Sequence, residues 1–176
     1  MQAGDVVADF TLQNQDGVSV SLSDYAAKPV VLFFYPRADT PGCTLESCGF
    51  RDIFAKFKKA GIVVLGISRD TVAKQKKFKD KYGLPYDLLA DPEMVLIKRF
   101  DLLKKKTMYG KPVTGVERTT YVIAPGTGKG QRLLHVFPKV TPAGHAEEVY
   151  ALLKFGAVLL KSSAAAKSSA AVGKKV

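Results

Sequence analysis

The chain has 176 residues, of which 47% are hydrophobic and 24% charged, and its formal net charge is +11 at pH 7. These values are typical of one folded domain, and no apolar run approaches the roughly 18 residues that a membrane span needs. The only cysteines, Cys43 and Cys48, are too few for a disulfide scaffold and lie close together in the chain, which indicates either redox chemistry or packing.

The N-terminal part of the chain predicts a hairpin and two buried strands. Residues 9–13 alternate polar and apolar, and residues 18–21 can pair back to them across a turn. The runs 30–35 and 62–67 are almost entirely apolar, which is typical of strands that are buried on both faces of a sheet.

A helix is expected between these two buried strands. Thr40 can cap it, Pro41 suits its first turn, and Gly61 ends it. Four apolar residues at helical spacing form its core-facing stripe: Phe50, Ile53, Phe54 and Phe57. Because a strand, a helix and a strand follow one another, the two strands should be parallel, with a right-handed crossover.

The rest of the chain alternates helices and strands. The expected elements are a helix capped by Asp70 and ending at residues 82–83, a strand at 88–90, a helix from Pro92 to about Phe100, strands 119–124 and 132–137 paired as a hairpin, and a helix at 147–160. This order predicts an α/β fold, in which a mixed central sheet carries helices on both faces, as in a thioredoxin-like core.

We expect residues 1–160 to form this domain and residues 161–176 to be a disordered basic tail. The tail consists of Ala, Ser, Lys, Val and Gly alone, without a core-forming pattern. The tail and the lysine-rich stretch 74–81 could attract nucleic acid or an acidic partner, but a solvated surface is the simpler interpretation.

Cys43 lies in the first turn of the expected helix, directly after a buried strand. The unpaired N–H groups and partial positive charge of a helix N-terminus both favour the thiolate, which is the nucleophilic form. A thiolate that attacks a peroxide also needs groups that hold the peroxide and stabilise the leaving oxygen. Thr40 can supply a hydroxyl, and Pro36 can shield the pocket from water. A zinc site is disfavoured because the only histidines, His135 and His145, are distant and fit structural roles.

The segment from Phe33 to Cys48 resembles the active-site segment of peroxiredoxins and is most similar to the peroxiredoxin Q (bacterioferritin comigratory protein) subfamily. The family pattern Pro-x-x-x-Thr-x-x-Cys is matched by Pro36, Thr40 and Cys43, and Cys48 matches the resolving cysteine of the subfamily. The family's arginine at the start of a later strand is matched by Arg118. The resemblance extends from about residue 3 to residue 160, and the basic tail departs from it.

This resemblance implies an enzyme, a thiol-dependent peroxidase that reduces hydrogen peroxide and organic hydroperoxides. Cys43 would become a sulfenic acid, Cys48 would condense with it to an intrachain disulfide, and a thioredoxin-like dithiol protein would reduce that disulfide. No metal or organic cofactor is implied, and a monomer would suffice because both cysteines lie in one segment. The alternative, from a different class, is a thioredoxin-fold redox sensor or a nucleic-acid-associated binding module.

The compartment is expected to be the cytoplasm. The first residues contain no basic region followed by an apolar stretch, so no secretory signal is expected. A nuclear location, or an organellar one after removal of a transit peptide, is the alternative.

Overall fold

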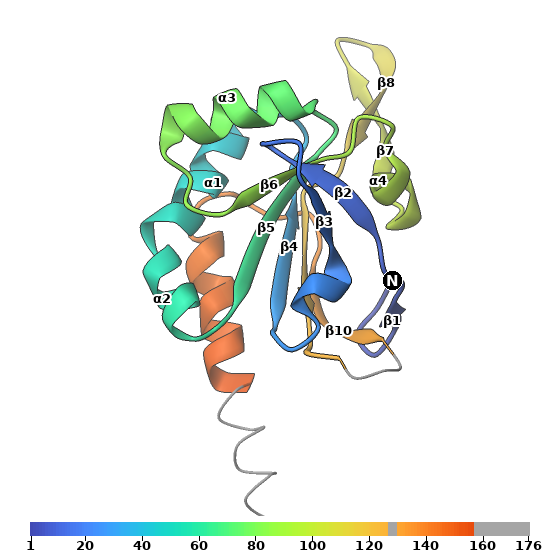
Figure 1. Cartoon of the computed structure of the whole chain (residues 1–176). Coiled ribbons are helices and arrows are strands. Elements are labelled where there is room, and N and C mark those ends of the chain that lie inside the picture. The colour runs from blue at the N-terminus through green and yellow to red at the C-terminus, as the bar shows by residue number, and fades with distance from the viewer. Residues whose placement is uncertain (127–129, 157–176) are drawn as a thin grey trace, which may run out of the picture.

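The computed structural model describes residues 1–126 and 130–156. Its centre is an eight-stranded sheet with the strand order β1-β10-β9-β4-β5-β6-β2-β3 (Figure 1). These strands are β1 (Val6–Val7), β2 (Thr11–Asn14), β3 (Ser19–Ser21), β4 (Val30–Phe34), β5 (Val63–Ser68), β6 (Asp87–Ala90), β9 (Thr119–Ile123) and β10 (Gln131–Phe137). A separate two-stranded sheet pairs β7 (Leu103–Met108) with β8 (Lys111–Val116).

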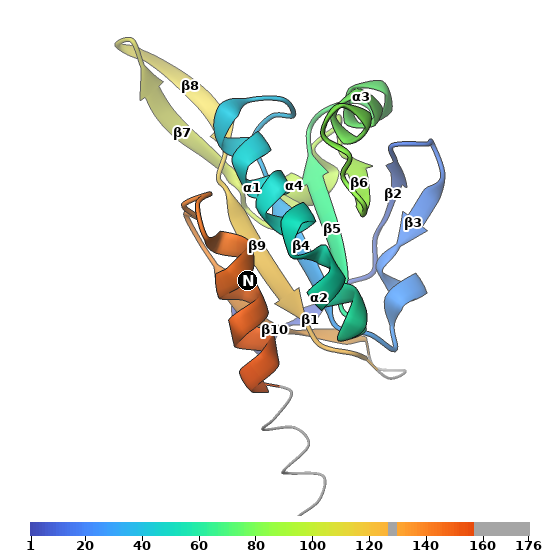
Figure 2. The ribbon, with the colours of Figure 1, turned by 90° about the vertical axis from the view of Figure 1, so that its left-hand side faces the viewer.

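The helices cover both faces of the sheet. They are α1 (Pro41–Asp52), α2 (Phe54–Lys59), α3 (Val72–Tyr82), α4 (Val95–Arg99), the 3-10 helix η1 (Leu22–Tyr25) and a last helix described at residues 145–156. One face packs on α1, α2, α3 and the last helix, and the opposite face packs on η1 and α4 (Figures 1 and 2). The predicted α/β fold with helices on both faces is therefore confirmed. Every helix in the described part of the chain is too short or too polar to cross a lipid bilayer.

The middle of the sheet follows the sequence expectation closely. Every residue of β4 is completely buried, as the continuous apolar run predicted. β4 pairs in parallel with β5, with Val30 opposite Val63, and antiparallel with β9. The expected hairpins form from β2 and β3 and from β9 and β10. The carboxyl end of β4 thus lies inside the fold, and residues 35–40 connect it to α1.

The helix expected between the two buried strands is broken. Ile53 leaves the helical conformation, with φ −112° and ψ 12°, and separates α1 from α2. Phe50 and Phe57 are completely buried, whereas Ile53 and Phe54 are only partly so. The break redirects the chain so that both phenylalanine side chains reach the same core, and neither proline nor glycine marks its position.

Two helix starts also differ from the prediction. α3 is capped by Thr71, whose hydroxyl accepts a hydrogen bond from the Lys74 N–H, rather than by Asp70. Its predicted end is correct, because Gly83 takes the left-handed conformation with φ 60°. α4 begins at Val95 rather than at Pro92, since the Asp91 carboxylate accepts the Val95 N–H and organises this later start.

The sequence analysis missed β1, β7 and β8 and placed the start of the last helix two residues too late. β1 is only two residues long, and β7, with three lysines in six residues, and β8 lack the apolar alternation that predicts a strand. The last helix begins at residue 145 rather than 147. Residues 157–160 and the expected disordered tail lie outside the described residues.

Candidate active site

Cys43 is held at the start of α1, just beyond the carboxyl end of β4. Pro41 is the first residue of the helix, and the side chain of Cys43 is only 1% exposed. The Thr44 N–H donates to the Thr40 carbonyl at 2.8 Å, which closes the first turn. The earlier N–H groups of such a turn have no partner within the helix, so they present positive charge to the sulfur.

Arg118 contacts Cys43 from a distant part of the chain. It lies between β8 and β9, 75 residues away in sequence, and its Nη2 donates to the Cys43 Sγ at 3.4 Å. The guanidinium passes directly over Gly42, where a Cβ would lie 3.1 Å from the same Nη2. The structure therefore brings together the cation and the thiol that the sequence placed far apart.

Glu46 is a third member of this cluster, and the sequence analysis missed it. Its Oε2 accepts a hydrogen bond from Arg118 Nη1 at 2.5 Å, and its side chain is 0% exposed. Burial raises the pKa of Glu46 to about 7, although the Arg118 cation opposes the shift. Its position three residues after Cys43 in a helix was the available signal, because residues at this spacing share a face.

The Thr40 hydroxyl does not cap α1, contrary to the expectation. It donates instead to the Arg37 carbonyl at 2.8 Å, while the Thr40 backbone keeps the extended conformation of a cap residue. Since the hydroxyl hydrogen is engaged, the oxygen of Thr40 can serve as an acceptor for a proton of a bound molecule.

The loop between β4 and α1, which contains Pro36, is fastened by the Asp70 carboxylate. Asp70 is 6% exposed, and its Oδ2 accepts from the Ala38 N–H at 2.7 Å and from the Ser68 hydroxyl at 2.8 Å. Two more buried side chains extend this network toward α3 and β4, namely Gln75 and Tyr35. Pro36 itself is partly buried at the end of β4.

Cys48 lies on the same helix as Cys43, and both are free thiols. Its neighbourhood is tied to α3 and β6, because Arg51 Nη1 donates to the Tyr82 carbonyl at 2.8 Å and the Tyr86 hydroxyl donates to the Ser47 carbonyl at 2.7 Å. In a regular helix, Cα atoms five residues apart are separated by roughly 8.7 Å. A disulfide needs about 4.4–6.8 Å, so α1 must change shape before the two sulfurs can bond.

Among the described residues, neither histidine forms a hydrogen bond with Cys43 or Cys48. His145 is buried, with its Nε2 2.8 Å from the Thr120 Oγ1, and burial lowers its pKa. His135 lies on β10 with its ring against Phe137. In the described part of the chain, no group of three or more His, Cys, Asp or Glu side chains is placed to hold a metal ion.

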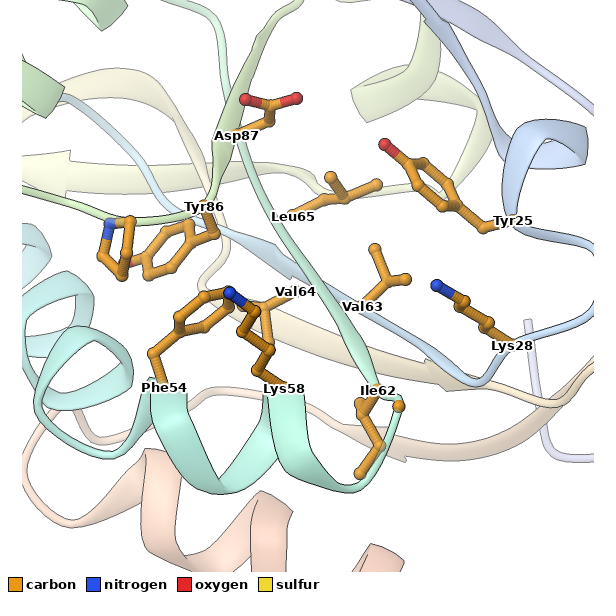
Figure 3. Close-up of a pocket in the computed structure, with 12 residues that line it drawn as sticks. Tyr25, Lys28, Phe54, Lys58, Ile62, Val63, Val64, Leu65, Tyr86 and Asp87 are labelled. Carbon is orange, nitrogen blue, oxygen red and sulfur yellow. The ribbon is translucent and has the colours of Figure 1, made fainter.

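Two hollows on the described surface differ in their position relative to the active-site loop. One, of about 290 Å³, lies between β5 and α2 and is lined by Tyr25, Phe54 and Tyr86 among others, but by neither cysteine (Figure 3). The other, of about 700 Å³, lies along α3 and the loop of residues 37–40, and Thr40 is part of its wall.

Proteins of similar sequence are peroxiredoxins. The chain is 42% identical over 149 residues to a putative peroxiredoxin bcp of Coxiella burnetii, covering 85% of the chain and 96% of that protein. It is 40% identical over 154 residues to peroxiredoxin Bcp of Bacillus subtilis, covering 88% of the chain and 96% of that protein. Residues 3–127 match the model of the AhpC/TSA family. This chain is a peroxiredoxin of the AhpC/TSA family.

Solved peroxiredoxins have the same fold. A cysteine mutant of PrxQ from Xylella fastidiosa matches with a TM-score of 0.83 and 36% identity, covering 89% of the chain and 98% of that structure. The bacterioferritin comigratory protein of Xanthomonas campestris matches with a TM-score of 0.78 and 37% identity, covering 84% and 92%. The peroxiredoxin is therefore an enzyme, a thiol peroxidase, whose reactants are a peroxide and a thiol reductant.

Proposed function

We propose that Cys43 is the peroxide-attacking residue of this peroxiredoxin, that Cys48 resolves the oxidised Cys43 as an intrachain disulfide, and that a thioredoxin-like dithiol protein reduces this disulfide. The observation that carries the proposal is the contact between Arg118 Nη2 and the Cys43 Sγ at the N-terminus of α1. A fixed cation and a helix N-terminus together favour the thiolate over the thiol.

In the first step, the Cys43 thiolate attacks one oxygen of the peroxide and the O–O bond breaks. The sulfur gains that oxygen as a sulfenic acid, and the other oxygen leaves as water or an alcohol after taking a proton. Arg118 stabilises the negative charge that builds on the leaving oxygen. The Thr40 oxygen accepts a hydrogen bond from the peroxide O–H, since its own hydrogen is donated to Arg37. Pro36, partly buried at the end of β4, limits the access of water to the Cys43 sulfur.

In the second step, Cys48 attacks the sulfenic sulfur of Cys43, and water leaves as the disulfide forms. The two cysteines share one chain segment, so a monomer can complete the cycle. The dithiol protein then attacks the disulfide, forms a mixed disulfide and departs oxidised, which leaves two thiols on the peroxiredoxin. A cytoplasmic location belongs to this proposal, because regeneration of the two thiols needs a reducing compartment.

We assign both hydrogen peroxide and organic hydroperoxides as substrates. The similar bacterioferritin comigratory protein of Xanthomonas campestris has alkyl peroxide reduction activity. The chemistry at Cys43 involves only the O–O bond, so the organic group can vary. A redox sensor would use the same first step without sustained turnover, and a nucleic-acid-binding module would not need it.

Peroxide consumption by the wild type, Cys43→Ser and Cys48→Ser tests the proposal. With a thioredoxin, its reductase and NADPH, the wild type should turn over continuously. Cys43→Ser should consume no peroxide while its circular dichroism spectrum stays native. Cys48→Ser should consume one equivalent per chain and then stop. Activity that survives in Cys43→Ser would contradict the assignment, and a wild type that stops after one equivalent would favour the sensor.

A further inference from the structure

The 700 Å³ hollow beside the active-site loop differs from the rest of the site in its charge. It is bounded by residues 37–40, which lead into α1, and by the outer side of α3. Its lining consists of Arg37, Ala38, Asp39, Thr40, Asp70, Lys74, Lys77, Phe78, Asp80 and Lys81. Thr40 belongs to this wall and to the surroundings of Cys43, so the hollow adjoins the reaction site without containing the sulfur.

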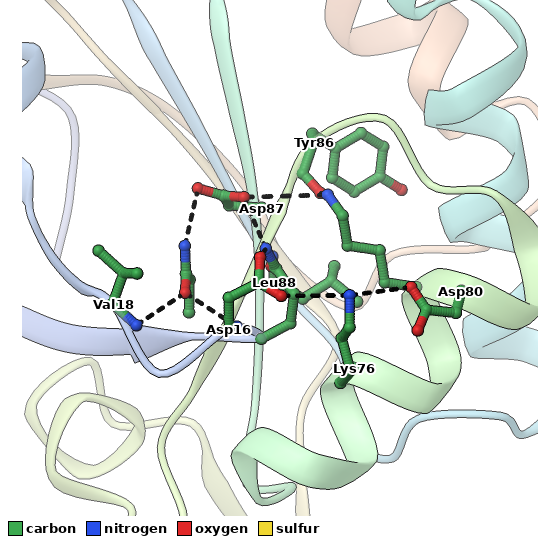
Figure 4. A network of polar contacts seen from close by, with 10 residues as sticks. Asp16, Val18, Lys76, Asp80, Tyr86, Asp87 and Leu88 are labelled. Atoms are coloured by element: carbon green, nitrogen blue, oxygen red, sulfur yellow. Dashed lines mark hydrogen bonds and ion pairs between the residues drawn. The ribbon is translucent and has the colours of Figure 1, made fainter.

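α3 carries five lysines within eleven residues, and three of them are neutralised. The ion pairs join Lys76 to Asp16 and Asp80, Lys79 to Asp87, and Lys81 to Asp39 (Figure 4 shows Lys76 with its two acids). These pairs use two of the three acids in the lining. The third, Asp70, is buried and points at the Ala38 N–H.

Three cations therefore remain uncompensated along this hollow. Arg37, Lys74 and Lys77 are exposed, and none of them forms an ion pair within residues 1–126 and 130–156. They come from the active-site loop and from two successive turns of α3. Such a group of like charges raises the positive potential at the mouth of the site and attracts a negatively charged surface.

A reductant has to approach this same side of the molecule. The Arg51 side chain, one turn after Cys48, is hydrogen-bonded to the Tyr82 carbonyl at the end of α3. α1 and α3 thus meet beside Cys48. A protein that places its thiolate against the Cys43–Cys48 disulfide must cover parts of α1, the loop of residues 37–40 and α3, whereas a peroxide is small enough to reach Cys43 alone.

We propose that Arg37, Lys74 and Lys77 form the docking surface for the acidic face of the dithiol protein that reduces this peroxiredoxin. The inference rests on the proposed function and names the partner's surface chemistry. The partner's thiolate attacks one sulfur of the Cys43–Cys48 disulfide, and its second thiol then displaces the mixed disulfide. Two electrons pass from the partner, which leaves as a disulfide, and the peroxiredoxin regains two thiols. Charges at the rim of such a complex act mainly on the association rate and its salt dependence.

The test uses charge reversal with a matched control in the full-length chain. Lys74→Glu/Lys77→Glu changes the proposed surface. Lys28→Glu/Lys59→Glu makes the same change in net charge at two exposed lysines that precede β4 and β5, at the opposite end of these strands. Each protein is first oxidised with one equivalent of hydrogen peroxide, and the disulfide is then reduced either by a thioredoxin of net negative charge or by dithiothreitol.

We expect the Lys74→Glu/Lys77→Glu protein to react with the acidic thioredoxin about tenfold or more slowly than the control at low salt, and the difference to shrink as salt screens the charges. Reduction by dithiothreitol and oxidation by hydrogen peroxide should be unchanged in both. Arg37 lies outside α3, so Arg37→Glu should slow the reaction with the acidic thioredoxin in part even if the double substitution destabilises that helix.

Several results would overturn the proposal. Equal slowing of both double variants would show that only net charge matters. If Lys74→Glu/Lys77→Glu slowed only the oxidation by a carboxylate-bearing hydroperoxide, the hollow would be assigned to the substrate. If it weakened only the binding of an oligonucleotide, the hollow would be assigned to nucleic acid. A wild type that forms no Cys43–Cys48 disulfide would overturn the proposed function itself, and this is seen before any variant is compared.

Discussion

Glu46 and Arg118 form a buried ion pair although they lie 72 residues apart in the sequence. The same guanidinium that donates to Glu46 through Nη1 donates to the Cys43 sulfur through Nη2. Glu46 thus fixes the orientation of the cation that faces the thiol. Its other oxygen, Oε1, is buried without a hydrogen-bond partner among the described residues, so the pair has been removed from water at a cost.

This burial should make the stability depend on pH through Glu46. Burial raises its pKa from 4.5 to about 7 in the folded protein. The folded state therefore holds the proton more tightly than the unfolded chain, and the free energy of unfolding should fall as pH rises from about 4.5 to 7, by at most about 3 kcal/mol. Glu46→Gln removes this contribution. Urea unfolding of both proteins at pH 5 and pH 8 should show a smaller pH effect in the variant, and parallel curves would contradict the expectation.

Removing the guanidinium should slow the reaction with peroxide. Arg118→Ala takes away the donor that contacts Cys43 and the partner of Glu46, and we expect the second-order rate constant with hydrogen peroxide to fall roughly 100-fold or more. Arg118→Lys should recover little, since an ammonium cannot bridge two groups as a planar guanidinium does. The control is Arg132→Ala, which removes an exposed arginine that bonds the Gly4 carbonyl. Equal rates for Arg118→Ala and this control would exclude the proposed role.

Oxidation should unwind the first turns of α1. Three buried hydroxyl or carboxyl oxygens of this helix lack hydrogen-bond partners in the described structure, on Thr44, Glu46 and Ser47, which makes the segment less costly to open. Amides from about Cys43 to Phe50 should lose protection from hydrogen exchange when the disulfide forms, while those of β4 keep theirs. Unchanged protection, with the Cys43–Cys48 bond verified by mass spectrometry, would mean that the disulfide fits without unwinding.

The loop before α1 should depend on Asp70. Asp70→Ala leaves the Ala38 N–H and the Ser68 hydroxyl without their acceptor, which we expect to lower the free energy of unfolding by about 2–4 kcal/mol and to slow peroxide reduction. Asp70→Asn keeps an oxygen at this position and should lose less. Asp80→Ala, which removes an exposed ion pair with Lys76 on α3, should change stability by less than about 1 kcal/mol. A similar loss in both alanine variants would remove Asp70 from this role.

Local patterns were sufficient to predict the middle of the fold and half of the site. The apolar run at residues 30–35 and the helix start at Pro41 place Cys43 correctly, because strand burial and helix N-terminal preferences act over a few residues. Arg118 was different. Nothing near it in the chain indicates a thiol 75 residues away, and only the family resemblance pointed to it.

The missed features depend on contacts that no short stretch of sequence contains. Glu46 looks like a surface residue of a helix until the fold places Arg118 beside it. Asp70 is a residue type that commonly caps helices, but the active-site loop lies beside it in the fold. Its carboxylate therefore accepts a hydrogen bond from the Ala38 N–H instead. The hairpin of β7 and β8 is rich in lysine and mostly exposed, so no buried face imposes an alternating pattern on it.

The break at Ile53 has a consequence for how far a structural change in α1 can spread. Helix formation and melting are cooperative along an uninterrupted run of hydrogen bonds, so a continuous helix would transmit fraying from Cys43 toward Lys59. With the run interrupted at Ile53, unwinding that starts at Cys43 can stay within α1. α2 can then remain anchored through the completely buried Phe57. The first turns of α1 can therefore unwind and re-form in each round of the proposed cycle while the core around Phe57 stays folded.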